Sequence, residues 1–361
     1  MSDTASESDV LLTVDRGIAT VTLNRPRAIN ALTHEMVRSI DAALVEWETD
    51  ASVRAVLIKG NGERGLCAGG DIVAIHDDAK AKAGENWPTG SATARFWRDE
   101  YIMNSRISRY TKPIVAIMDG AVMGGGVGIS AHASERIVTE KSKIAMPEVG
   151  IGFVPDVGGT YLLARTPGEI GTHLALTTAR MTAGDAIAAG FADTYIPTES
   201  LADFVEALHT GTVDTALSLA SAAPESALIG QRSWIDEAYS GEDASAIVER
   251  LRALGHDDAV AAADAIESKS PTSVAVTLRS LRRAAAASSL DEVLDDEYRV
   301  SIACLDSPDL VEGIRAQVVD KDRQPTWSPP RLKDVSPADV DRFFAPLGDA
   351  ELGLASKGPS S

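Results

Sequence analysis

The first 120 or so residues contain four short apolar runs and, between the second and third of them, one segment whose apolar positions repeat with the spacing of a helix. Residues 10–14 and 17–23 are rich in Val, Leu, Ile and Thr and predict two short strands around a turn. Residues 34–49 repeat their apolar positions with the spacing of a helix that has one buried face. Residues 53–59 and 113–118 are almost continuously apolar, which is typical of strands covered on both faces.

The same alternation continues towards the middle of the chain. Bulky apolar positions predict a helix over residues 96–110, and short apolar runs predict strands at 136–139 and 143–145. The small and polar residues 77–92 predict a mobile loop. Repeated alternation of strand and helix predicts an α/β architecture. The spacing by itself does not distinguish a doubly wound sheet from a stacked spiral.

The second half of the chain reads mainly as helix, apart from one short strand expected at residues 191–196. The expected helices span residues 160–176, 183–189, 201–209, 244–254, 257–269, 273–287 and 290–305. The pattern divides the chain into a disordered tail at 1–9, a core at 10–200, a helical region at 201–323 and an irregular, Pro-rich arm at 324–361.

Composition narrows the function classes. The 361 residues carry a net charge of −19, which argues against binding nucleic acid or an anionic membrane surface. Two cysteines far apart in sequence offer neither a disulfide framework nor a zinc motif. The acidic first ten residues do not have the pattern of a leader peptide, and no apolar run is long enough for a membrane span. We therefore expect a cytoplasmic protein.

The most informative stretch, residues 119–160, combines glycines with two carboxylates. Gly124, Gly125 and Gly126 form a run that lets the backbone approach a ligand and point an N–H at it. Glu148 and Asp156 follow in an apolar loop, where poor solvation tends to raise the pKa of a carboxylate. Donors for an oxyanion beside such a carboxylate suit chemistry at a carbonyl.

Each of these features also has a plain structural explanation. The glycine run can be a tight packing turn, and Asp156 can be the N-cap of the helix that follows it. Glu100 lies in a helix of mixed charge and can belong to a solvated or ion-paired face. Glu148 is different, because its apolar surroundings in the sequence offer it no partner.

The chain resembles the crotonase, or enoyl-CoA hydratase/isomerase, superfamily, over nearly its whole length. The matching motifs are LNRPRAINAL at 23–32, CAGGDI at 67–72, MDGAVMGGGVGIS at 118–130, AMPEVGIGFVPDVGG at 145–159, SPTSVAVTLRSL at 270–281, DEYRVSIACL at 296–305 and EGIRAQVVDKDRQPTW at 312–327. The resemblance implies a spiral of ββα turns followed by a C-terminal helical region. The FVPDVGG and DKDRQPTW segments are similar to a branch that hydrolyses short 3-hydroxyacyl-CoA thioesters. The implied reaction is cleavage of 3-hydroxyisobutyryl-CoA in valine degradation.

The resemblance also implies roles for five residues. The backbone N–H groups of Ala68 and Gly125 would bind the thioester carbonyl as an oxyanion hole. Glu148 would attack the carbonyl or activate water, and the sequence does not separate these two routes. Asp156 would hold or polarise the substrate near its 3-hydroxyl, and Glu100 would be a third carboxylate of the pocket.

One departure from the hydratases of the superfamily bears on the reaction. Hydratases carry a second catalytic glutamate after the glycine run, and Gly128 stands at that position here. A glycine cannot move a proton, so thioester hydrolysis is favoured over hydration. A hydratase or isomerase of the same fold and a non-catalytic acyl-CoA-binding protein remain alternatives. The resemblance implies no metal and no redox cofactor, since CoA is part of the substrate, and it leaves homo-oligomer formation open.

Overall fold

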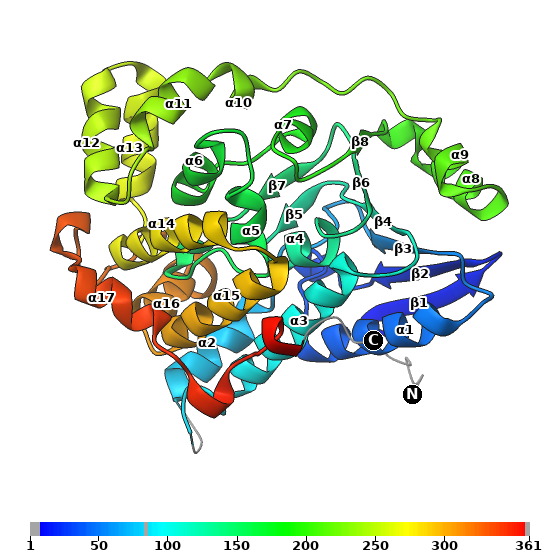
Figure 1. Ribbon diagram of the computed structural model, residues 1–361, viewed down its shortest axis with the longest axis horizontal. Coiled ribbons are helices and arrows are strands. Elements are labelled where there is room, and N and C mark those ends of the chain that lie inside the picture. Colours follow the sequence, from blue (N-terminus) through cyan, green and yellow to red (C-terminus); the bar gives the residue numbers. More distant parts are fainter. Residues whose placement is uncertain (1–7, 83–85, 358–361) are drawn as a thin grey trace.

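A computed structural model of the chain describes residues 8–82 and 86–357 (Figure 1). Its framework is a six-stranded sheet of order β1-β2-β3-β4-β6-β8, in which β1 and β2 are antiparallel and all other neighbours are parallel. The strands of this sheet are β1 (Val10–Asp15), β2 (Ile18–Leu23), β3 (Ala55–Gly60), β4 (Ile114–Ile117), β6 (Glu135–Val138) and β8 (Thr194–Tyr195).

A second stack of short extended segments runs beside this sheet. β5 (Ala121–Met123) follows β4, β7 (Lys143–Ala145) follows β6, and the two pair in parallel. Isolated bridges extend the stack, because Cys67 pairs with Val122 and Ile144 pairs with Met181. β3, β4 and β6 are thus each followed by a short segment in the stack and then by a helix, so the chain advances as a spiral.

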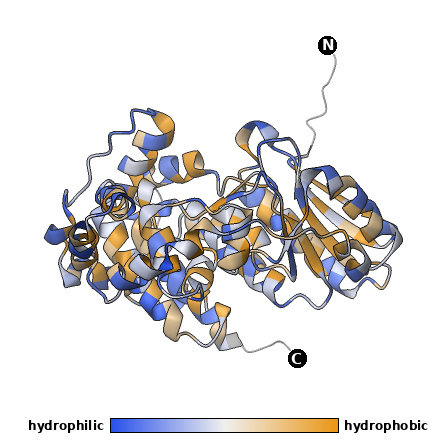
Figure 2. Ribbon diagram, turned by 90° about the horizontal axis from the view of Figure 1, so that it is seen from above, coloured by the Kyte–Doolittle hydropathy of each residue, from blue (hydrophilic) through white to orange (hydrophobic). Residues whose placement is uncertain are grey.

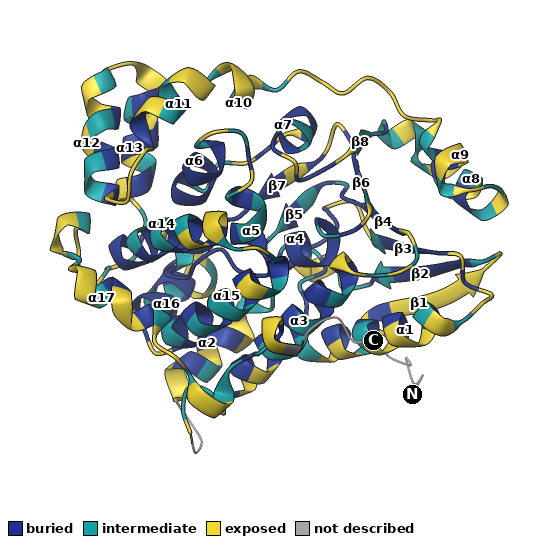
Figure 3. Ribbon diagram, viewed as in Figure 1, coloured by how far each residue is buried: buried dark blue, intermediate teal, exposed yellow. Residues whose placement is uncertain are grey.

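Helices cover both faces of the six-stranded sheet (Figures 1 and 3). Side chains of β2 and β3 alternate between the faces, as the period of a strand requires. One set joins the main core under α1 (His34–Thr49) and α3 (Ala92–Ser108), and the other packs against α8 (Leu201–Thr210) and α9 (Val213–Leu217). Figure 2 shows the resulting hydrophobic strands between amphipathic helices.

Shorter helices lie between the strands and after them along the chain. They are η1 (Pro26–Ala28), α2 (Ile72–Ala81), α4 (Gly125–Ser130), η2 (Glu148–Ile151), α5 (Gly159–Leu163), α6 (Ile170–Thr177), α7 (Ala183–Ala188) and η3 (Thr198–Ser200).

The C-terminal helices form a separate group at the opposite end of the view from α8 and α9 (Figure 1). They are α10 (Ala227–Gly230), α11 (Arg232–Ala238), α12 (Ala244–Leu254), α13 (Asp257–Glu267), α14 (Pro271–Ala286), α15 (Leu290–Leu305) and α16 (Pro308–Ile314). The arm that follows has only short helices: the π-turn η4 (Arg315–Val319), η5 (Leu332–Asp334), α17 (Pro337–Asp341), η6 (Arg342–Phe344), η7 (Gly348–Ala350) and η8 (Ala355–Lys357). α15 and α16 return to the core, where they pack against α3 and α2.

The structure confirms most of the expected elements and corrects four. The loop predicted over residues 77–92 is wrong in part, because α2 continues to Ala81; residues 83–85 of it lie outside the described residues. α3 begins four residues before the predicted start, where the Ser91 hydroxyl accepts a hydrogen bond from the N–H of Ala94.

The other two corrections concern chain breaks. The helix predicted over 160–176 is two helices, α5 and α6, because the Pro167-Gly168 pair lies between them. The strand predicted at 191–196 is only the two-residue β8. Of the tail predicted at 1–9, residues 1–7 lie outside the described residues.

Among the helices in the described part of the chain, none has both the length and the apolar character needed to cross a bilayer.

Candidate active site

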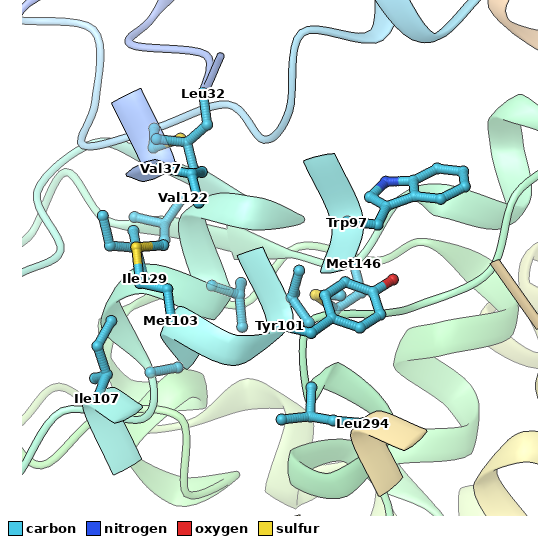
Figure 4. Packing of buried hydrophobic residues seen from close by; sticks show 14 of the residues in the cluster. Leu32, Val37, Trp97, Tyr101, Met103, Ile107, Val122, Ile129, Met146 and Leu294 are labelled. Atoms are coloured by element: carbon cyan, nitrogen blue, oxygen red, sulfur yellow. The ribbon is translucent and has the colours of Figure 1, made fainter. Parts of the chain in front are cut away.

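A cavity of about 240 Å³ lies where the spiral meets the C-terminal helices. Its wall is mainly apolar, with carboxylates at three points, as is typical of sites that take a small organic ligand. The lining comes from the 68–70 turn, α2, α3, the 123–125 turn, the loop from 147 to 156, and α16. The rings of Trp97 and Phe153 stack 5.1 Å apart on this wall, and Figure 4 shows Trp97 beside Tyr101 on α3.

Two backbone N–H groups, of Gly70 and Gly125, lie close together in the glycine turns of this cavity. The amide nitrogen of Gly70 lies 3.4 Å from the position that a Cβ on Gly125 would take. Within the part of the chain that the structure describes, neither the Gly70 nor the Gly125 N–H donates to another protein group. The pair is therefore free to bind a carbonyl oxygen or an oxyanion.

The expected role of Ala68 as an oxyanion donor is contradicted by its hydrogen bond. The Ala68 N–H donates to the carbonyl oxygen of Ile29 at 2.9 Å, so it is already used in the fold. Gly69 has φ +109, which turns the chain so that the next N–H, that of Gly70, is the free one. Ala68 still lines the cavity, but only as part of its wall.

Glu148 begins the 3₁₀ turn η2 and projects towards the glycine run. Its Oε1 lies 2.9 Å from the position that a Cβ on Gly124 would take, so a side chain there would displace the carboxylate, and Gly124 also has φ +48, which favours glycine. The side chain is buried, and its Oε2 has no hydrogen-bond partner among the described residues. Burial, and then the charge of Asp156, raise the pKa of Glu148 well above its usual range. Once ionised, Glu148 therefore binds a proton more strongly than a solvated carboxylate does, and it lies beside the glycine run of the candidate oxyanion hole.

Glu100 lies on the buried face of α3, on the other side of the glycine turn. Its Oε1 is 2.6 Å from the position of a Cβ built on Gly125, and this oxygen has no partner within the described chain. Burial, and then the charge of Asp156, raise the pKa of Glu100 well above its usual range. The solvated or ion-paired face considered for Glu100 is therefore wrong.

Asp156 is the third carboxylate of the cavity and the one with an identified donor. Its Oδ2 accepts a hydrogen bond of 2.7 Å from the hydroxyl of Tyr101 on α3. Burial raises the pKa of Asp156 to about 7, although the hydrogen bond from Tyr101 lowers it in part. The N-cap of α5 is Gly158, so the capping role considered for Asp156 is wrong.

The position of the missing second glutamate is filled by other side chains. A Cβ on Gly128 would lie 2.7 Å from Cβ of Val157 and about 3 Å from both amide atoms of Asn104. Asn104 is fully buried one turn after Glu100 on α3, and its amide has no partner among the described residues. The only sequence signal for Asn104 is its place four residues after Glu100, which puts the two polar side chains on the same face of α3.

Comparison with known proteins assigns the family. The enoyl-CoA hydratase/isomerase family matches residues 18–344. The chain belongs to this family. The 3-hydroxyisobutyryl-CoA hydrolase of Gallus gallus, named as mitochondrial, is 39% identical over 97% of this chain and 92% of its own length.

Two solved structures resemble the chain even more closely in sequence. A carnitinyl-CoA dehydratase from Mycobacterium thermoresistibile is 53% identical, with a TM-score of 0.91 over 96% of this chain and 98% of its own. An enoyl-CoA hydratase from Rhodobacter sphaeroides is 45% identical, with a TM-score of 0.89 over 96% of this chain and 99% of its own. The expected crotonase spiral with a C-terminal helical region is confirmed.

Within residues 8–82 and 86–357, no group of three or more His, Cys, Asp or Glu side chains is arranged to hold a metal ion. The expectation that the reaction uses neither a metal nor a redox cofactor stays a prediction.

Proposed function

We propose that the chain hydrolyses the CoA thioester of a short 3-hydroxy acid, with 3-hydroxyisobutyryl-CoA as its substrate and valine degradation as its setting. The observation that carries the proposal is that one cavity is lined by two residues with free N–H groups, Gly70 and Gly125, and by the buried carboxylate of Glu148. The names of the curated vertebrate relatives support the choice of substrate.

In this mechanism, the thioester carbonyl oxygen accepts hydrogen bonds from Gly70 and Gly125. Removal of one such donor typically costs about 3–4 kcal/mol of oxyanion stabilisation. Glu148 then either takes a proton from an attacking water or attacks the carbonyl itself. In the first route, water adds to the carbonyl carbon, the C–S bond breaks, and the proton taken up by Glu148 passes to the sulfur, so that the free acid and the CoA thiol leave. In the second route, the C–S bond breaks as Glu148 forms a mixed anhydride with the acyl group, and water then hydrolyses this anhydride to the acid and restores Glu148, with the thiolate protonated from that water. The raised pKa makes ionised Glu148 a better base than a solvated carboxylate.

Asp156 and Glu100 give the acyl pocket its polarity. Both carboxyls line the cavity beside the apolar side chains of α3 and α16. Each can hydrogen-bond to a hydroxyl on the acyl chain, which would distinguish a 3-hydroxyacyl group from its deoxy analogue. Asp156 is the better candidate, because Tyr101 fixes its orientation.

A hydratase or dehydratase is the second candidate, because the two solved structures of 53% and 45% identity carry those names. The packing around Gly128 disfavours it. A second glutamate cannot be accommodated there without displacing Val157, and an acid and a base on one side of a double bond are what hydration needs.

Thiol release from 3-hydroxyisobutyryl-CoA, isobutyryl-CoA and crotonyl-CoA tests the proposal. We expect rapid release from the first, slower release from the second, and no loss of the double-bond absorbance of the third. Loss of that absorbance without thiol release would identify a hydratase instead. Tight binding of all three without turnover would identify a non-catalytic acyl-CoA-binding protein.

The cytoplasmic location that the sequence favours stays a prediction, since the vertebrate relatives are named as mitochondrial. Homo-oligomer formation likewise stays open.

A further inference from the structure

Asp156 lies at the start of a strained turn, residues 156–160. Val157 has φ +54, a left-handed conformation that a β-branched residue rarely adopts, and Gly158 follows at φ +78. Strain of this kind persists only where the surrounding structure holds it. One support is His132, whose Nε2 donates to the carbonyl oxygen of Val157 at 2.8 Å.

The main support comes from Glu297, far away in the sequence on α15. Its Oε2 accepts from the N–H of Gly158 at 2.6 Å. Its Oε1 accepts from the N–H of Thr160 at 2.9 Å and from the Thr160 hydroxyl at 2.5 Å. The side chain is 2% exposed, and no cation of the described chain forms an ion pair with it. This buried carboxylate therefore has the turn as its partner.

A second contact from α15 reaches Asp156 from another direction. Ser301, four residues after Glu297 and on the same face of the helix, lies 2.8 Å from the hydroxyl of Tyr101. That hydroxyl donates to Asp156. α15 thus contacts both the backbone after Asp156 and the donor that orients its carboxylate, and Asp156 itself lines the cavity.

We propose that Glu297 is a positioning residue for Asp156, which it keeps in its cavity orientation by holding the strained turn. The C-terminal helical region then contributes to the site by positioning one of its carboxylates, in addition to lining the cavity with α16. The kinetic test of this inference rests on the proposed function, because it measures thiol release. The test by amide exchange at residues 156–160 does not depend on that reaction.

The variant Glu297→Gln keeps the volume of the side chain but replaces one acceptor oxygen by an amide donor. That donor must face the N–H of Gly158 or the donors of Thr160, so at least one hydrogen bond is lost. We expect faster amide exchange in the peptide that covers residues 156–160. We also expect kcat to fall by about 10- to 100-fold with KM little changed, since displacement of a positioned group acts on the chemical step.

A double-mutant cycle shows whether Glu297 acts through Asp156. With Asp156→Asn present, Glu297→Gln should reduce kcat little further, because the group that it positions is already removed. Multiplicative effects of the two changes would overturn the proposal. Thr160→Ser, which keeps the hydroxyl donor, should stay close to wild type, whereas Thr160→Val should lose part of the activity.

Asp185→Asn is the matched control. Asp185 is also buried and accepts hydrogen bonds from a threonine hydroxyl and from backbone N–H groups, but it lies on α7, outside the cavity lining. It should lose stability without a comparable loss of kcat, and an equal loss would reduce Glu297 to a structural role. If wild type releases no thiol, the proposed function fails, and the cycle is run on crotonyl-CoA. Unchanged exchange at residues 156–160 in Glu297→Gln overturns the holding role in either case.

Discussion

Replacing Asp156 by asparagine should make the protein more stable above neutral pH while it harms the site. Asn keeps an oxygen that can accept the hydrogen bond from Tyr101, but it removes a carboxyl whose ionised form is disfavoured by burial. The pKa of this carboxyl is about 7 in the folded protein and 3.8 in its ordinary state. The difference of about 3 units corresponds to at most about 4 kcal/mol, at 1.36 kcal/mol per unit.

The sign follows from the bound protons. Between pH 3.8 and about 7, the folded protein keeps the Asp156 proton and the unfolded chain releases it. The contribution to stability is therefore complete below pH 3.8 and is lost as the pH rises towards 7. The Asn variant should lack this slope, which amounts to about 1.4 kcal/mol per pH unit for one proton.

Urea denaturation of wild type and Asp156→Asn at pH 5, 6, 7 and 8, at constant ionic strength, measures this difference. Asp185→Asn gives the opposite expectation. Burial raises the pKa of Asp185, but its hydrogen bonds, of which that from Thr182 is the largest, together lower it below its usual value. That variant should be less stable than wild type at pH 7 and should keep the wild-type slope. An unchanged slope in Asp156→Asn, or lower stability at pH 8, would refute the reasoning.

Two further predictions concern side chains around the cavity. Gly125→Ala should reduce kcat/KM by about 10- to 100-fold, because its Cβ would lie 2.6 Å from Glu100 Oε1. The control is Gly150→Ala, whose Cβ meets only a lysine methylene at 3.9 Å and which should be close to wild type. Equal thiol-release rates for the two variants would contradict this prediction. Iodoacetamide should not inactivate the enzyme at pH 7.5, because Cys67 is buried and burial raises the pKa of its thiol to about 12. Rapid loss of activity with labelling of Cys67 would contradict this prediction and would show that the turn around Cys67 opens.

The periodic and glycine-rich parts of the fold were accessible from the sequence. Continuous apolar runs marked β3 and β4, and the helical spacing of the apolar positions marked α1 over residues 34–49. The carboxylates Glu148 and Asp156 were found because they follow the glycine run in an apolar loop, and nothing near Glu148 in the sequence could pair with it. Each of these features depends on residues that are close together in the sequence, so it can be recognised from the sequence alone.

The features that the sequence did not reveal depend on contacts over long distances or on one backbone torsion. Ala68 and Gly70 lie in the same small-residue motif, and only φ of Gly69 decides which N–H is free. Glu297 and the turn it holds are separated by 137 or more residues, so no local pattern links them. Asn104 became relevant only when the structure placed it beside Gly128.

The spiral itself was inferred from the resemblance and not from the spacing of the strands. A strand followed by a helix fits a doubly wound sheet equally well. The decisive contacts are the bridges from Cys67 to Val122 and from Ile144 to Met181, which stack the short segments into a second layer. Pairing of this kind joins residues far apart in sequence, so periodicity does not reveal it.

The central claim is that Glu148, opposite the Gly70 and Gly125 N–H groups, cleaves the thioester. The most direct test is the rate of thiol release from 3-hydroxyisobutyryl-CoA by wild type and by Glu148→Gln, which keeps the shape of the side chain but cannot accept the proton or attack efficiently. The account predicts a fall in kcat of about 1,000-fold with KM little changed. A variant that keeps about a tenth or more of the wild-type kcat would contradict it and would place the chemistry on another group of the cavity.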